Sequence, residues 1–151
     1  MDRKEMSAGD RMAAMRTALS FQRTRMAADR TLMSVQRTSL SLIGFGFTIF
    51  SFFRSLADKK LLGDALPSEA PARFGLTLVA LGVALLALGI ASHFNYMKQL
   101  RGQRDEMMVT ELLPPEPGLP VSLALVAAFT LLVFGLFVIL CIMARSAPFG
   151  A

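Results

Sequence analysis

Arginine and threonine recur with a strict period in the first quarter of the chain. Four Arg-Thr pairs follow one another every seven residues, at Arg16-Thr17, Arg23-Thr24, Arg30-Thr31 and Arg37-Thr38. Seven residues make almost two α-helical turns, so the arginines are expected to form one slowly drifting row. Guanidinium groups bind phosphate oxygens bidentately, and threonine hydroxyls beside them can add donors. The pattern predicts an anion-binding surface made of Arg16, Arg23, Arg30, Thr31, Arg37 and Thr38.

Two other interpretations of the arginines remain open at this stage. They could anchor the helix to anionic lipid headgroups, or they could pair with Asp29, Glu106 or Glu111 inside a helical bundle. The register argues modestly against simple anchoring, because headgroups do not require a seven-residue repeat. Arg37 is the hardest to explain as an anchor, since it stands next to an apolar run and arginine at membrane depth is costly.

Apolar residues follow the same period. One line lies about 40° from the arginines at roughly 100° per residue, and it consists of Met12, Leu19, Met26, Met33 and Leu40. A second line consists of Ala14, Phe21, Ala28 and Val35. Two apolar lines predict a helix that packs against neighbours on more than one side, with its arginines facing a polar space.

The elements that position these residues are membrane spans. The 151 residues are 54% hydrophobic, with a mean hydropathy of +0.52. Phe74–Tyr96 and Val121–Met143 are apolar runs of 23 residues each, and at about 1.5 Å per residue both cross the roughly 30 Å hydrocarbon core. Only 16 residues separate Arg37 from Arg54, roughly 24 Å of helix. We expect this run to cross with the help of snorkelling arginines; a re-entrant segment is the alternative.

The expected fold is therefore an all-α integral membrane protein with three transmembrane helices. Its parts are a basic N-terminal helix at 1–38, a three-span domain at 39–145 and a short tail at 146–151, with spans at about 39–54, 74–96 and 121–143. The basic run 98–104 is expected to open the second loop. Eleven of the 16 Lys and Arg residues precede the first span or lie between the second and third. The positive-inside rule thus predicts a cytoplasmic N-terminus and an external C-terminus.

Glycines mark one face of the second predicted span. Gly75, Gly82 and Gly89 stand seven residues apart, and small residues on one line allow membrane helices to approach closely. We predict that they pack against another helix, either of this chain or of a second subunit.

Catalysis is not expected. The chain has one His and one Cys, whereas metal sites need clustered His, Cys or carboxylates, and no phosphate-binding glycine loop or nucleophile motif is present. We expect no catalytic residue, metal or cofactor, and we expect His93 to lie at the membrane interface. The pI of about 10.1 would suit a nucleic-acid binder, but the three spans account for the chain better.

Residues 28–40 resemble the YidH-like family of small inner-membrane proteins, whose function is unassigned. That family shares its domain with the small transmembrane subunit of the vacuolar transporter chaperone, the eukaryotic polyphosphate polymerase complex. The matching positions are Arg30, Thr31, Leu32, Arg37 and Thr38, while Asp29 replaces Glu, Ala28 replaces Asn and Val35 replaces Trp. The resemblance implies three spans in the inner (plasma) membrane. It also implies a phosphate- or polyanion-conducting role for Arg30 and Arg37.

Two hypotheses follow. In the first, a homo-oligomer forms an arginine-lined cytoplasmic vestibule that binds phosphate-rich anions or polyphosphate, with conduction as its extension. In the second, the protein is a non-conducting accessory or scaffold subunit whose arginines anchor lipid headgroups or pair within the bundle.

Overall fold

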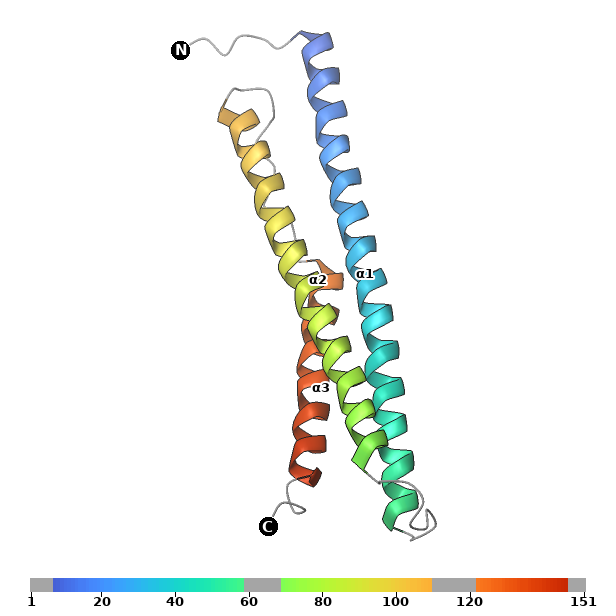
Figure 1. Ribbon diagram of the computed structural model, residues 1–151. Helices are drawn as coiled ribbons and strands as arrows, with labels where there is room; N and C mark the ends of the chain where they lie inside the picture. Colours follow the sequence, from blue (N-terminus) through green and yellow to red (C-terminus); the bar gives the residue numbers. More distant parts are fainter. Residues whose placement is uncertain (1–6, 59–68, 110–121, 147–151) are drawn as a thin grey trace.

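In the part of the chain that the computed structural model describes, three helices run alternately in opposite directions (Figure 1). The structure describes residues 7–58, 69–109 and 122–146. Helix α1 spans Ala8–Asp58, α2 spans Glu69–Val109 and α3 spans Leu123–Ser146. All three are long and apolar enough to cross a membrane. The expected all-α fold with three transmembrane helices is confirmed.

Helix α1 is one uninterrupted element of 51 residues. It begins with a capping box, in which the backbone N–H of Asp10 donates to Ser7 Oγ (3.2 Å) and that of Ser7 donates to Asp10 Oδ2 (3.3 Å). No proline occurs within α1, so nothing interrupts the backbone hydrogen bonds between the basic segment and the apolar run. The helix continues through Arg37 and Arg54 without the reversal of direction that a re-entrant segment requires.

Helix α2 is longer than the sequence suggested. Residues 98–104 were expected to open a loop, but they are helical, and α2 ends only at Val109. The segment is rich in good helix formers, and its buried Leu100 lies with Phe21 along the line where α2 meets α1. Residues 8–28 of α1 and 97–109 of α2 therefore form a two-helix arm that extends beyond α3 (Figure 1).

Close backbone contact sets the register between α1 and α2. A Cβ atom on Gly75 would lie 2.7 Å from the carbonyl oxygen of Gly46, and one on Gly82 would lie 3.0 Å from that of Ser39. A Cβ on Gly89 would lie 2.7 Å from Val35 Cγ1. Gly75, Gly82 and Gly89 thus face α1 of the same chain, at distances that a larger residue could not occupy without movement. Gly46 completes the closest crossing from the α1 side.

Two apolar clusters fill the space between the three helices. One consists of Ile43, Phe50, Val79, Val83, Val138 and Ile142. The other consists of Leu32, Leu86, Ile90, Ala124 and Ala128. Each cluster draws on all three helices, so α3 covers the inner faces of both α1 and α2 below the arm.

Replacing Gly75 with alanine should destabilise the bundle. The added methyl would collide with the Gly46 carbonyl and the Phe50 backbone, so the helices must separate, at a cost of about 1–3 kcal/mol. Gly44→Ala is the matched control, because nothing lies within 4 Å of its added Cβ. Detergent unfolding followed by far-UV circular dichroism measures both variants. Equal stabilities for the two would refute the tight crossing.

Candidate functional site

The four arginines of the repeat lie on one exposed face of α1. Arg16, Arg23, Arg30 and Arg37 are all exposed, and we call them the arginine row. None of the four makes an ion pair with another residue of the described ranges 7–58, 69–109 and 122–146. Their guanidinium groups are therefore open to a ligand, to lipid or to a second molecule.

The threonines of the repeat use their hydroxyl protons locally. Thr31 Oγ1 donates to the carbonyl of Ala27 (3.1 Å), and Thr38 Oγ1 donates to that of Ser34 (3.2 Å). Such bonds to the preceding turn are common for threonine in helices. In this arrangement the arginines supply the donors on this face, and a threonine must rotate before it can donate to an anion.

A row of exposed apolar residues runs beside the arginines. The methionine row comprises Met12, Leu19, Met26, Met33 and Leu40, with side-chain exposures between 48% and 62%. Phe47 continues it within the apolar run. The second apolar line behaves differently, because Ala14 is buried and Phe21, Ala28 and Val35 are half-buried toward α2. One apolar line of α1 is thus covered by α2 of the same chain, and the other is left exposed.

A third line of small residues flanks the arginine row on its other side. Its members are Ala13, Ser20, Ala27, Ser34, Ser41, Thr48 and Ser55, all exposed. The arginine row itself continues through the apolar run as Gly44 and Ser51. These two lines of α1 therefore stay small and mostly hydroxyl-bearing beyond Arg37, while exposed Phe45, Phe47 and Phe52 stand beside them.

A polar cluster joins the three helices where α3 begins. Ser122 Oγ donates to Asp29 Oδ1 at 2.8 Å, and His93 Nε2 lies 3.6 Å from the same oxygen. Ser122 directly precedes α3, whose N-terminal dipole favours a nearby carboxylate. His93 is 7% exposed and lies between the helices, while its expected level at the membrane interface stays a prediction. Only the tertiary pairing with Asp29 explains its burial, and a single sequence does not reveal that pairing.

The cluster does not have the geometry of a catalytic triad. In a triad, histidine lies between serine and the carboxylate and accepts the serine proton. Here Ser122 donates directly to Asp29, and His93 approaches that carboxylate from another helix. The arrangement holds a carboxylate in place between the helices. Within the described ranges, no group of three His, Cys, Asp or Glu residues is placed to hold a metal ion.

Gln36 adds a second connection between α1 and α3. Its Nε2 donates to the carbonyl of Ala124 at 2.5 Å. Gln36 is seven residues after Asp29 and thus on the same face of α1. The two contacts fix where α3 starts along α1.

This registration determines the depth of the arginine row. The apolar helix α3 starts beside Asp29 and Gln36, and Gly89, within the apolar part of α2, touches Val35. The apolar segments of α2 and α3 therefore extend along α1 on the N-terminal side of residue 39, where α1 itself is not yet apolar. Arg37 follows Asp29 by eight residues, or roughly 12 Å of helix. Arg37 thus lies alongside apolar segments of the neighbouring helices, Arg30 lies at the level of the polar cluster where α3 begins, and Arg16 and Arg23 belong to the arm.

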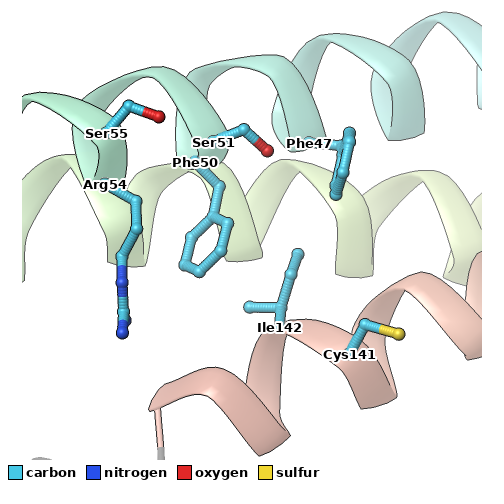
Figure 2. A pocket seen from close by; sticks show the side chains of 7 residues that line it. All are labelled: Phe47, Phe50, Ser51, Arg54, Ser55, Cys141 and Ile142. Atoms are coloured by element: carbon cyan, nitrogen blue, oxygen red, sulfur yellow. The ribbon is translucent and has the colours of Figure 1, made fainter. Parts of the chain in front are cut away.

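A small cavity of about 230 Å³ lies at the opposite end of the bundle (Figure 2). Phe47, Phe50 and Ser51 line it from α1, and Cys141 and Ile142 line it from α3. Arg54 and Ser55 bring further polar groups to its rim, and the Arg54 side chain extends from α1 past Phe50 (Figure 2). The hydroxyl-bearing face of α1 therefore ends near another arginine.

Fold and site together define a multi-pass helical membrane protein with an exposed arginine row on its first helix. The chain belongs to the family described as a Domain of unknown function (DUF202), whose model matches residues 23–101. This is the domain of YidH-like small membrane proteins, so the resemblance seen in the sequence is confirmed. The match includes Arg23, Arg30, Arg37 and His93. No curated protein and no solved structure matches the chain.

Breaking the pair of Asp29 and His93 should loosen the bundle. Asp29→Ala and His93→Ala each leave a polar partner unsatisfied, so each should lower the free energy of unfolding by about 1–3 kcal/mol. Because they remove one shared interaction, the double variant should lose less than the sum, with a coupling of about 1 kcal/mol.

Detergent unfolding of the four proteins in this cycle measures the coupling. Asp105→Ala is the control, because Asp105 is an exposed carboxylate on the arm, and its loss should change stability by less than about 0.5 kcal/mol. Strictly additive effects of Asp29→Ala and His93→Ala would show that the two side chains do not interact.

Proposed function

We propose that the protein is an oligomeric inner-membrane protein that binds phosphate-rich anions, with polyphosphate as the leading ligand, through its arginine row. The N-terminal arm lies in the cytoplasm and the C-terminus lies outside. The arginines of several copies face a shared polar space and form its binding surface.

The position of Arg37 beside apolar segments of α2 and α3 is the observation that carries this proposal. Arg37 and the neighbouring Arg30 are both exposed and have no acidic partner within residues 7–58, 69–109 and 122–146. A charged side chain at membrane depth normally faces protein, water or a counter-ion. Arginine side chains tilt toward the N-terminus of their helix and can snorkel, but Arg37 starts roughly 12 Å below Asp29. A shared polar space with bound anions supplies both water and counter-charge.

The partners of Asp29 also favour an external ligand for the arginines. A structural network would require carboxylates beside the row, but Asp29 is held by Ser122 and His93. Glu111, another candidate partner, lies outside the described residues. Phosphate groups fit the open guanidinium groups because they accept paired hydrogen bonds in a planar fork.

The methionine row supports association of several copies. These side chains lie exposed next to the arginine row, and those of the arm would otherwise face water. Copies in one membrane share one orientation, so their methionine rows can meet in parallel at matching heptad positions. Such contact brings the arginine rows of neighbours together, where a polyanion relieves their repulsion.

Conduction is the natural extension of binding in this arrangement. Beyond Arg37 the same face presents Gly44, Ser41 and Thr48, which are small and exposed. A ring of such faces would leave a polar path that leads toward Ser51 and Arg54 at the other end. Rings of basic residues at the entrance of a pore select anions.

Neutralising the deep arginines should abolish polyanion binding. We expect polyphosphate to bind the purified wild-type protein in a salt-sensitive manner, and Arg30→Gln/Arg37→Gln to bind at least about tenfold more weakly, because charge-assisted hydrogen bonds contribute about 1.5–3 kcal/mol each. Arg30→Lys/Arg37→Lys should bind with intermediate affinity, since lysine keeps the charge without the fork. Calorimetric titration across a salt series measures these affinities.

A charge-matched control separates the effect of the arginine row from the effect of net charge on polyphosphate binding. Lys98→Gln/Arg101→Gln removes two exposed positive charges from α2 and should leave affinity within about twofold, as expected for screened surface charges. Equal, weak binding by all four proteins would reject the polyanion site and leave the arginines as lipid anchors of a non-conducting accessory subunit.

Polar substitution in the methionine row should weaken the oligomer. Met26→Gln removes a side chain whose burial contributes about 1.5–3 kcal/mol, so the association constant should fall at least about tenfold. The matched control is Met15→Gln, because Met15 is 68% exposed but lies off the row. Light scattering coupled to size exclusion in detergent measures the masses. An unchanged mass for Met26→Gln would remove the methionine row from the interface.

A further inference from the structure

A long groove runs between α1 and α2, and none of its lining residues comes from α3. It consists of two adjoining cavities of about 520 and 250 Å³, which share Thr24 and Tyr96. Small residues produce the larger hollow, among them Ala27, Ala28 and Gly89. The groove lies on a different face of α1 from the methionine row, so association through that row leaves it open to the membrane.

Polarity changes steadily along this groove. Its inner end is lined by Val35, Leu85 and Leu88, which are apolar. Its outer end, toward the arm, is lined by Ser20, Gln99 and Gln103. From Leu85 to Gln103 the helix rises roughly 27 Å, which is comparable to one leaflet of about 20–22 Å with its headgroup. The gradient and length match a lipid that stands along the membrane normal.

A buried nitrogen in the middle of the groove lacks a partner. His93 lines the larger cavity and directs its Nε2 toward Asp29. Its Nδ1 is buried and makes no hydrogen bond within the described part of the chain. Buried polar atoms in proteins nearly always have a partner. The protein itself covers this nitrogen, so His93 marks only the level at which the lining of the groove changes from apolar to polar.

We propose that this groove is a binding site for one membrane glycerophospholipid. Its acyl chain lies along Val35, Leu85 and Leu88, and its glycerol and ester region lies at the level of His93 and Tyr96. Its headgroup reaches Gln99 and Gln103 on the arm. Tyrosine suits this boundary, because its ring is apolar and its hydroxyl is polar.

A phospholipid matches the groove better than a helix from a second copy does. A transmembrane helix with its side chains is about 10–12 Å across and has no headgroup. A phospholipid matches the apolar end and the polar end of the groove together. The site is independent of the arginine row and stands whether or not that row binds polyanions.

Blocking the groove from either wall should displace the lipid. Ser92→Phe fills it from α2 and Ala27→Phe fills it from α1, since both residues line the groove and are exposed. Native mass spectrometry of the delipidated full chain, titrated with palmitoyl-oleoyl phosphatidylglycerol, measures retention. We expect both variants to bind about tenfold more weakly, a change equivalent to about 1.4 kcal/mol. The control Ala91→Phe adds the same ring to an exposed neighbour outside the groove, and its binding should be unchanged.

Two results would overturn the proposal. One is undiminished binding by both groove variants. The other is a change in oligomeric mass in lipid-free detergent for both variants but not for Ala91→Phe, which would identify the groove as a contact between copies.

Photo-crosslinking of the wild-type protein gives an answer that does not depend on how the variants fold. The probe is phosphatidylglycerol with a diazirine in its acyl chain. Crosslinks at Val35, Leu85 or Leu88 support the site. Crosslinks confined to the outer face of α3, where Phe129, Val133 and Phe137 are exposed, reject it.

Discussion

The carboxylate of Asp29 is the constraint on which the rest of the arrangement depends. A partly buried carboxylate needs polar partners around it; here Ser122 donates to it from the residue before α3, and His93 of α2 lies 3.6 Å from the same oxygen. Ser122 fixes the first turn of α3 and His93 fixes α2. Because α2 and α3 both contact this one residue, Asp29 fixes the position along α1 at which the apolar bundle begins. That level sets the depth of every arginine on α1.

On the C-terminal side of Asp29, close van der Waals packing and not polar contacts holds α1 and α2 together. The contacts of Gly75 with Gly46 and of Gly82 with Ser39 bring backbones together, which increases dispersion contact where the lipid gives no hydrophobic drive for association. The polar contacts of Asp29 and the glycine contacts together occupy the faces of α1 that point into the bundle. The arginine and methionine rows are what remains outside, and the bundle does not determine how they are covered.

The sequence predicted most of the fold because membrane spans are defined by composition alone. The three apolar runs gave three helices, and the seven-residue period gave one exposed arginine row. The length of α2 was underestimated, since charged residues 98–104 suggest a loop until Leu100 is seen buried against α1. For a related reason, the burial of His93 was not predicted. Its environment is created by Asp29 and Ser122, which are distant in sequence, and no local pattern encodes that meeting. The depth of Arg37 likewise follows only from the register of α3.

The unbroken course of α1 has a mechanical consequence. Fifty-one residues of helix amount to roughly 76 Å, and with no proline to bend it this element behaves as a stiff rod. Its tightest contact with α2 is at Gly46 and Gly75, close to one end. Because Asp29 and Gln36 tie the same rod to α2 and α3 nearer its middle, α1 cannot tilt about that crossing alone without breaking these contacts, and a force on the arm is transmitted to the whole bundle.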